Sequence, residues 1–242
     1  MKKKNFVVDK ETHKQLVHAE KMLALGELGA GIAHEINNPL CCISNYLQLL
    51  LMSEEKLDNE MLVCLKSMMN SANRIKEIVN NFLNFVRTVD ERKEKSSLNI
   101  NSILDATASQ VETLEHFKNV RIIKKYYPEI PAIKCNRNQI MEAFLNLFNN
   151  AKDAMPGGGR LYIKTEPHNN SIRVIIKDTG VGIKGKNIDK IFDPFFTTKR
   201  LGEGTGLGLT ATYGIILNHS GNIQVESQVG KGTSFIIDLP IN

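Results

Sequence analysis

The sequence predicts two domains of different class, an all-α helical hairpin followed by an α+β domain in which helices lie beside a largely antiparallel sheet. In the N-terminal part, apolar residues recur at spacings of three and four over two long segments, which is typical of amphipathic helices. After a charged stretch, helical periodicity mixes with strand-like alternation and glycine-rich turns. At 242 residues the chain is long enough for two such domains, each with its own core.

Composition excludes several classes of protein. No apolar run reaches the roughly eighteen residues of a membrane-spanning helix. The opening MKKKN is not followed by a signal-peptide hydrophobic segment, so we expect a cytoplasmic protein without a membrane span. The four cysteines have neither metal-ligand spacing nor a disulfide pattern, which favours reduced thiols. The net charge of +5 is modest and no recognised motif accompanies it, so we expect no nucleic-acid partner.

The first long helix is predicted to end at about Met52, and its apolar residues form one stripe. His34 lies roughly 160–200° around this helix from Ile32 and Ile36, so its side chain should point away from the stripe. Pro39 lies inside the helix, where its missing N–H and its ring should bend the helix just after the histidine. The stripe consists of Leu25, Leu28, Ile32, Ile36, Leu40, Ile43, Leu47 and Leu50.

The surroundings of His34 would let a bulky partner approach its imidazole. Ala30 and Gly31, which precede it by four and three residues on a helix, are both small. Glu35 is adjacent in sequence, and Asn38 lies one helical turn later on the same face. The spacing alone leaves an ordinary surface histidine as the alternative.

The second helix shows an unbroken alternation of four- and three-residue spacings, which is typical of a coiled-coil seam. A charged turn over residues 53–59 separates it from the first helix. Two helices in one chain bury too little apolar surface alone, so we predict that two chains pair into an antiparallel four-helix bundle, a homodimer. A monomeric hairpin packed against the rest of the chain is the alternative. The apolar positions are Met61, Leu65, Met68, Ala72, Ile75, Val79, Phe82 and Val86.

These patterns divide the chain into four predicted parts: an N-terminal stem over residues 1–20, a helical domain over 21–89, a charged linker over 90–97 and an α+β domain over 98–242. Pro156 and three glycines after it should end the second helix of the last part. Helices are predicted there over 99–118, 138–155 and 207–219, and strands over 120–127, 160–166, 171–178, 222–227 and 233–239.

The segment HEINNP, followed by a hydrophobic helix, resembles the phosphoacceptor box of the two-component sensor histidine kinases. The resemblance implies that His34 attacks the γ-phosphate of ATP while Glu35 orients the imidazole and accepts its other N–H proton. It also implies a homodimer whose partner is a response-regulator receiver domain, with an aspartate that takes the phosphoryl group. At Asn38 it implies a water-positioning side chain that gives phosphatase activity toward this regulator. A structural residue near the Pro39 bend is the alternative for Asn38.

Four segments of the C-terminal part are similar to the boxes of the GHKL superfamily of ATP-binding domains, also called Bergerat folds, which are two-layer α+β domains. In the first, NLFNNAKDAM, helical spacing places Asn146 and Asn150 on one face. The resemblance makes Asn150 the protein ligand of the Mg²⁺ that accompanies ATP. For this segment alone, a pair of amides facing solvent is the alternative. Asp153 stands where many family members have a phosphate-contacting lysine, which leaves the role of Lys152 open.

The second box, DTGVGI, ends a predicted strand. In the resembling family its carboxylate, here Asp178, accepts a hydrogen bond from the adenine amino group, while Gly180 and Gly182 let the backbone approach the base. With Gly185 the stretch also fits the GxGxxG dinucleotide fingerprint. That fingerprint requires a βαβ unit and a parallel sheet, whereas the strand before it is predicted to form a hairpin, so we reject this interpretation.

The third and fourth boxes are IFDPFFTTK and GEGTGLGL, and GKGTSF near the end matches the closing element of the family. The resemblance implies a lid anchored by Phe192, Phe195 and Phe196, with glycines that supply freedom and N–H donors at the start of the next helix. A flexible loop and a solvated lysine are the alternatives if the other boxes are ignored. The residues implied to bind the nucleotide are Lys199, Gly204, Gly206, Gly208 and Thr233.

One position separates the chemistries of this superfamily. In members that hydrolyse ATP, a glutamate four residues before the Mg²⁺-binding asparagine activates water. Here that position is Asn146, which is a poor base. We therefore expect a protein-histidine autokinase with ATP and Mg²⁺ as cofactors. An ATPase of the same superfamily and a nucleotide-sensing scaffold without catalysis are the alternatives.

Overall fold

The structure, a computed structural model, describes residues 35–52, 58–88, 95–199 and 204–241. Three predicted features fall outside these residues: the stem over residues 1–20, the histidine at position 34 and most of the charged turn between the first two helices. The chain divides into two compact units, residues 1–89 and 90–242.

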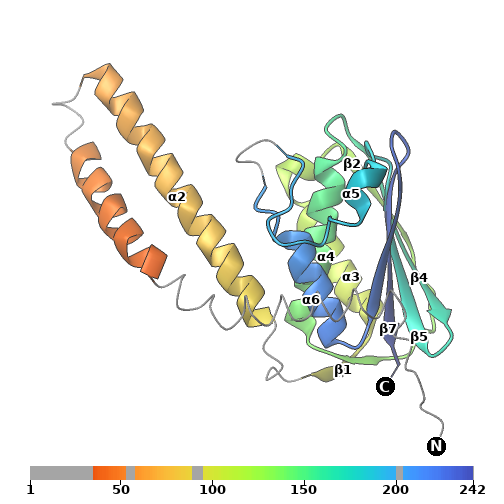
Figure 1. The fold of residues 1–242 in the computed structure, drawn as a ribbon. Coiled ribbons are helices and arrows are strands. Elements are labelled where there is room, and N and C mark those ends of the chain that lie inside the picture. Colours follow the sequence, from red (N-terminus) through yellow and green to blue (C-terminus); the bar gives the residue numbers. More distant parts are fainter. Residues whose placement is uncertain (1–34, 53–57, 89–94, 200–203, 242) are drawn as a thin grey trace, which may run out of the picture. The chain divides into compact units, whose positions relative to one another are not determined.

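Two helices form the described part of the N-terminal unit, one over residues 35–51 and α2 over Asn59–Thr88. The side-chain oxygen Oδ1 of Asp58 caps α2 by accepting a hydrogen bond from the Met61 N–H at 2.7 Å. The predicted helical hairpin is therefore confirmed (Figure 1). The two helices pack through a small apolar core made of Leu40, Leu47 and Ala72, with Leu65 and Met69 against it.

A second row of apolar side chains on the same two helices is uncovered. Its members follow the same seven-residue repeat as the packed residues but occupy a different position in it. The predicted apolar stripe thus splits into two rows, one that closes the hairpin and one that faces outward. The uncovered row consists of Ile36, Ile43 and Leu50 on the first helix and Met61, Met68 and Ile75 on α2, which are 39–56% exposed.

The C-terminal unit has two layers, a five-stranded sheet and helices on one of its faces (Figure 1). The strand order is β2-β4-β5-β7-β6, in which only β2 and β4 run parallel. This largely antiparallel α+β arrangement confirms the predicted fold class. The strands are β2 Val120–Lys125, β4 Gly159–His168, β5 Ser171–Asp178, β6 Asn222–Gln228 and β7 Gly232–Pro240, and the helices are α3 Ile100–Glu112, α4 Arg137–Asp153 and α6 Gly208–Asn218.

Alternation along the strands explains why one face of the sheet is buried. In β4, Leu161 and Ile163 are fully buried, while the residues between them face the other side. The helices pack on this buried face through apolar residues at spacings of three and four. Phe144 and Phe148 of α4 are completely buried there. Burial of each such aromatic ring stabilises the fold by about 1.5–3 kcal/mol. Asn136 caps α4 with Oδ1, which accepts from the Gln139 N–H at 3.1 Å.

Some short elements differ from the prediction. Ser96–Leu98 forms β1, which pairs antiparallel with β3, Ile133–Cys135, although residues 96 and 97 were expected in the linker. Helix α3 ends at Glu112, and the 3-10 helix η2, Glu115–Phe117, follows where a continuous helix was predicted. A short helix, α5 Gly185–Ile188, was not predicted either. Among the described residues, no helix combines the length and apolar character needed to cross a membrane.

Candidate nucleotide-binding site

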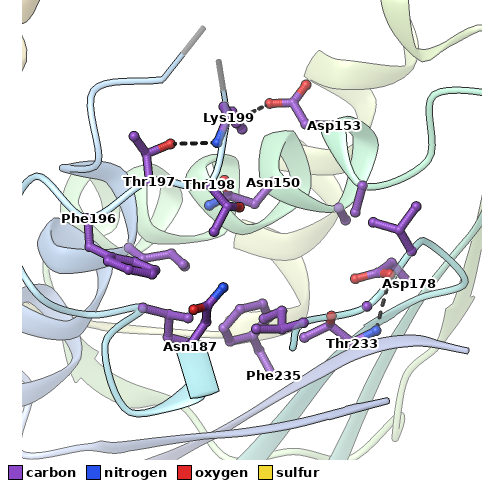
Figure 2. A pocket seen from close by; sticks show the side chains of 17 residues that line it. Asn150, Asp153, Asp178, Asn187, Phe196, Thr197, Thr198, Lys199, Thr233 and Phe235 are labelled. Atoms are coloured by element: carbon purple, nitrogen blue, oxygen red, sulfur yellow. Dashed lines mark hydrogen bonds and ion pairs between the residues drawn. The ribbon is translucent and has the colours of Figure 1, made fainter. Parts of the chain in front are cut away.

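A pocket of about 230 Å³ opens in the C-terminal unit, over the face of the sheet that carries the helices (Figure 2). Four of the sequence-predicted polar residues in its lining come from four separate stretches of the chain. Asn150 comes from α4, Asp178 from the end of β5, Lys199 from the loop before α6, and Thr233 from the start of β7. The fold thus gathers residues from four of the boxes that were identified in the sequence.

Asp178 is the most enclosed polar group of the pocket, with 3% of its surface exposed. Its oxygen Oδ1 accepts hydrogen bonds from the backbone N–H groups of Gly180, at 2.8 Å, and Thr233, at 3.1 Å. Burial raises the pKa of the Asp178 carboxyl above its ordinary value, although both hydrogen bonds favour the charged form. The side chain is therefore a fixed acceptor in a poorly solvated position.

The glycines after Asp178 have a packing role in this structure. A Cβ at Gly180 would lie 2.5 Å from the carbonyl oxygen of Ala154. Gly182 has φ +70°, and a Cβ there would lie 2.2 Å from the carbonyl oxygen of Gln228. The loop needs glycine at both positions because its own backbone passes so close to α4 and to the end of β6. The sequence analysis had attributed the same glycines to a close approach of the base.

The apolar side of the pocket comes from residues that also belong to the core. Ile191 and Phe235 line it and are buried, and Phe196 packs against the same core. Phe192 packs there too, but Phe195 is 54% exposed and has φ +63°. The packing of Phe192 and Phe196 supports the prediction that they anchor the base of the lid, and for Phe195 this role stays a prediction.

Lys199 forms an ion pair with Asp153 of α4 on the wall of the pocket (Figure 2). The Lys152 amino group lies 3.1 Å from the same carboxylate. Burial alone would raise the pKa of Asp153, but the hydrogen bonds and charges of the two lysines outweigh it and hold this pKa below its ordinary value. In the structure, Lys199 therefore binds the Asp153 carboxylate, whereas the sequence predicts that it binds a phosphate.

A second cavity, of about 260 Å³, adjoins the first and shares Asn150 and Lys199 with it. The Nδ2 group of Asn146 donates a hydrogen bond to the Gly208 carbonyl at 3.2 Å, which joins α4 to the first residue of α6. Among the residues that the structure describes, no side chain caps the N-terminus of α6. Its first N–H groups are consequently available to an anion. The predicted residues that line this cavity are Asn146, Gly204, Gly206 and Gly208.

Two predicted site residues of the HEINNP box that the structure describes lie in the N-terminal unit. Glu35 and Asn38 both belong to the helix over residues 35–51 and are exposed. His34 precedes the first described residue.

Several pocket residues were missed by the sequence analysis. Asn187 of α5 lines the pocket, but α5 is too short to be recognised from periodicity. Thr197 and Thr198 also line it, and their position inside one of the quoted boxes was a usable signal. Phe235 could have been found from the alternation of β7, which turns its side chain inward.

Two models of known protein families match this chain. The His Kinase A phospho-acceptor domain matches residues 24–91, and the Histidine kinase-, DNA gyrase B-, and HSP90-like ATPase domain matches residues 135–242. Sporulation kinase A of Bacillus subtilis is 35% identical over 231 residues, which cover 96% of this chain and 37% of the relative.

Solved structures agree with these matches. The catalytic domain of histidine kinase ThkA is 30% identical, with a TM-score of 0.55, and the match covers 61% of this chain and 96% of that domain. A complex of ThkA with the response regulator protein TrrA matches with a TM-score of 0.63 and 26% identity, over 98% of this chain and 68% of that one. The chain therefore belongs to the histidine kinases of two-component systems, and its C-terminal unit is an ATP-binding domain of the GHKL type. It spans little more than a third of the length of sporulation kinase A.

Proposed function

We propose that this chain is an ATP-dependent protein-histidine kinase that phosphorylates His34 and passes the phosphoryl group to an aspartate of a response-regulator receiver domain. The observation that carries the proposal is the Asp178 carboxylate, buried in a pocket whose wall also holds Asn150 and Lys199. Such an arrangement suits a ligand with a hydrogen-bond donor at one end and negative charge at the other, as in ATP.

The pocket residues fit the two ends of the nucleotide. Asp178 would accept a hydrogen bond from the adenine amino group, and Thr233, whose N–H holds the carboxylate, would keep that acceptor in place. Phe235 and Ile191 give the base an apolar wall. Toward the phosphates, the chain offers Lys199 and the uncapped N-terminus of α6. ATP supplies the phosphoryl group.

Asn150 is the proposed protein ligand of Mg²⁺. Within the ranges that the structure describes, no group of three or more His, Cys, Asp and Glu side chains could hold a metal ion. A neutral amide oxygen is a suitable single ligand for Mg²⁺, because this ion keeps several waters and binds phosphate oxygens. The metal would offset negative charge on the transferring group.

The protein side of the reaction divides between the two units. Neutral His34 attacks the γ-phosphorus of ATP through a ring nitrogen, the bond from that phosphorus to the β–γ bridging oxygen breaks and ADP leaves, and the exposed Glu35 accepts the proton from the other ring nitrogen. Asn146 cannot act as a base toward water, and its amide is already bonded to the Gly208 carbonyl. Attack by water is therefore disfavoured relative to attack by the imidazole.

The split apolar stripe of the hairpin supports a homodimer. One row closes the hairpin, and the uncovered row from Ile36 to Ile75 would be buried when a second hairpin packs against it as a four-helix bundle. In this proposal the receiver domain docks on the bundle beside the histidine. We place the reaction in the cytoplasm, where ATP is available and thiols stay reduced.

Asn38 is proposed to hold the water that hydrolyses the phospho-aspartate of the regulator. Its side chain is exposed one helical turn after His34. We expect Asn38→Ala to keep substantial autophosphorylation and to lose phosphatase activity, because only hydrolysis needs the ordered water. Both activities should be measured with a cognate regulator. A parallel loss of the two would assign Asn38 a structural role near Pro39.

Incubation with γ-labelled ATP followed by acid treatment tests the proposal. A histidine kinase becomes labelled and loses the label in acid, because phosphohistidine is acid-labile. His34→Ala should bind ATP as the unchanged chain does and remain unlabelled. Release of phosphate without labelled protein would indicate an ATPase, and nucleotide binding with neither product would indicate a scaffold.

A further inference from the structure

The open face of the five-stranded sheet carries a concentration of basic side chains at its β2 edge. Because Leu161 and Ile163 of β4 point into the core, Tyr162 and its two neighbours at i±2 point to the opposite face. No described element of the C-terminal unit covers that face (Figure 1). We call this region the cationic face; it consists of Arg121, Lys125, Arg160, Lys164 and Lys177 around Ile123 and Tyr162.

The register of β2 and β4 brings like charges opposite each other. Arg121 is paired with Arg160 and Lys125 with Lys164, and these two rows lie on either side of the Ile123–Tyr162 row. Like charges in directly opposite positions destabilise a sheet. Packing of the core does not explain why these like charges are opposite each other, because the four charged side chains all lie on the outer side of the sheet.

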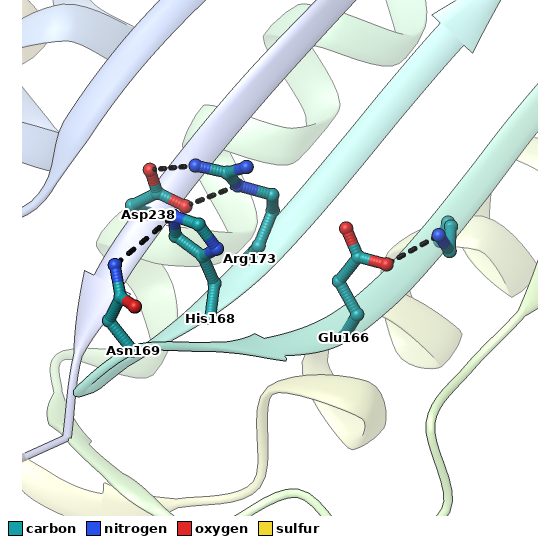
Figure 3. Close-up of polar contacts among 6 residues, drawn as sticks. Glu166, His168, Asn169, Arg173 and Asp238 are labelled. Atoms are coloured by element: carbon teal, nitrogen blue, oxygen red, sulfur yellow. Dashed lines mark hydrogen bonds and ion pairs between the residues drawn. The ribbon is translucent and has the colours of Figure 1, made fainter.

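Several charges on the same face are paired, and Lys164 of the cationic face is one of them. Arg173 of β5 binds Asp238 of β7 through two hydrogen bonds of 2.8 Å, and Glu166 holds Lys164 (Figure 3). Arg121 and Lys125, by contrast, have no carboxylate partner among the described residues, and both are exposed. Positive charge is therefore uncompensated toward the β2 edge.

Two further residues extend this uncompensated charge. Lys177 of β5 is exposed, has no ion-pair partner within the described ranges, and is registered with Tyr162 from the other side. Arg160 donates a hydrogen bond to the Tyr162 hydroxyl at 3.2 Å, which leaves its charge in place. Tyr162 thus has cations at i−2 and i+2 on its own strand and Lys177 opposite it on β5, while Ile123 lies opposite it on β2.

We propose that the cationic face is a docking surface for an acidic protein partner that presents carboxylates around a central apolar side chain. Tyr and Arg are enriched in protein–protein contact regions, and here Tyr162 and Ile123 form an apolar centre between the two arginines and the lysines. At about 3.3 Å per residue, the two cationic rows lie about 13 Å apart, the scale of such a contact centre. The inference does not depend on the proposed kinase activity.

Other anionic partners fit this face less well. Single-stranded nucleic acid is bound by several aromatic rings on which successive bases stack, and the cationic face has one. A membrane surface would take up apolar side chains that protrude, whereas Ile123 and Tyr162 are half-buried between longer basic side chains. An acidic protein surface can instead carry an apolar side chain that reaches Ile123 and Tyr162 between the basic side chains.

Titration of the full chain with defined probes tests the proposal. The probe is a peptide with three glutamates on each side of a Leu-Phe pair, and a second peptide replaces that pair with Ser-Ser. Arg121→Glu with Lys125→Glu should weaken binding of the first peptide at least about tenfold, because both charges are reversed. Lys134→Glu with Arg137→Glu, the same charge change at exposed positions off this face, should alter it less than about twofold. The Ser-Ser peptide should bind at least about threefold more weakly.

Stability and activity measurements separate a binding effect from damage to the fold. A glutamate opposite Arg160 replaces repulsion by attraction, while Lys164 is already paired with Glu166, so the melting temperature of the double variant should rise by about 1–3 °C, mainly through position 121. Labelling with γ-labelled ATP should be unchanged in this variant, because none of its altered residues lines the pocket. If the double variant fails to fold, Lys177→Glu alone should still weaken peptide binding about threefold.

Two results would overturn the proposal. One is that the Leu-Phe peptide binds the Arg121→Glu/Lys125→Glu variant and Lys177→Glu as tightly as the unchanged chain, or does not bind the unchanged chain at all. The other is preferential binding of phosphatidylglycerol vesicles or of an oligothymidylate over the Leu-Phe peptide, which would assign the face to lipid or to nucleic acid. A chain that binds the peptide but does not autophosphorylate would refute the proposed function and leave this surface intact.

Discussion

At the scale of single residues, Asp178 connects the fold to the proposed chemistry. Its carboxylate is held by two backbone N–H groups from the residues Gly180 and Thr233, which are far apart in sequence. The contact is made only when the loop after β5 and the start of β7 are both in place. The orientation of the acceptor therefore depends on tertiary structure.

We expect Asp178→Ala to weaken ATP binding about 10- to 100-fold, because a hydrogen bond to a charged acceptor is lost. Asp178→Asn is the matched control for the fold, since its amide oxygen can still accept from Gly180 and Thr233. Calorimetric titration with ATP should show the loss in both variants, while the melting temperature falls mainly in the alanine variant. Unchanged ATP affinity in Asp178→Ala would contradict the proposed pocket.

Asp153 is expected to compete with the nucleotide for Lys199. Its carboxylate pairs with that lysine in the structure and lies on the pocket wall that the phosphates are proposed to approach. Asp153→Asn keeps the size of the side chain but removes its negative charge. ATP should then bind about 3- to 10-fold more tightly in fluorescence or calorimetric titrations, because one repulsion disappears and Lys199 is released.

Lys199→Ala gives the complementary measurement, and ATP affinity should fall in that variant. Weaker ATP binding by Asp153→Asn would instead show that Asp153 itself supports the phosphates or their metal ion.

These two carboxylates also show what a sequence can reveal about a site. Asp178 could be predicted because it stands in a compact motif next to glycines, where neighbours in sequence are neighbours in space. The pairing of Asp153 with Lys199 could not, because 46 residues separate the partners and the fold alone brings them together. Asp153 was noticed only as a departure from the pattern of the family.

At the scale of elements, His219 joins α6 to α4. Its Nδ1–H group donates to the Ile215 carbonyl at 2.7 Å, and Nε2 accepts from the Asn136 N–H at 3.0 Å. Only the neutral ring can make both bonds. Burial lowers the pKa of His219 below 6.5, the charge of Lys95 acts in the same direction, and the Ile215 carbonyl opposes them.

This geometry predicts a loss of stability at mildly acidic pH. The unfolded chain takes up a proton on His219 near pH 6.5, while the folded chain does so only at lower pH, so stability falls as the pH decreases below about 6.5. The loss is at most about 1.4 kcal/mol per pH unit, or about 3–6 °C in melting temperature. His219→Gln should show a smaller decrease than the unchanged chain between pH 7.5 and 5.5. In His116→Gln, a change at an exposed position, the decrease should equal that of the unchanged chain.

Elements of sufficient length could be predicted from the sequence. Strands β4 and β5 were found because their alternation continues over 10 and 8 residues on either side of a polar turn. Strands β1 and β3 have 3 residues each, too few for a periodicity to be distinguished from chance. Their pairing is set by contacts between residues 96–98 and 133–135, which no local pattern records.

At the scale of the whole molecule, the two units divide the proposed reaction between a phosphoacceptor and a nucleotide site. The sequence predicts the boundary from the charged, turn-like residues 90–97, which separate long helical periodicity from a mixed pattern of helices and strands. The sequence shows a single apolar stripe on each helix. It does not indicate which residues of the stripe pack inside the hairpin and which remain exposed. The structure separates a packed row with Leu40 and Leu47 from an uncovered row with Ile43 and Met68.

The uncovered row predicts the outcome of a dimerisation experiment. In Ile43→Asp with Met68→Asp, two carboxylates would enter the proposed seam, and burial of an unpaired charge is strongly unfavourable. Light scattering should give the mass of two chains for the unchanged protein and of one chain for the variant. Gln48→Asp, which adds charge at an exposed polar position, should remain dimeric. ATP affinity should stay within about twofold in both variants, since no residue of the row lines the pocket. A dimer that survives the double substitution would show that this row is not the interface.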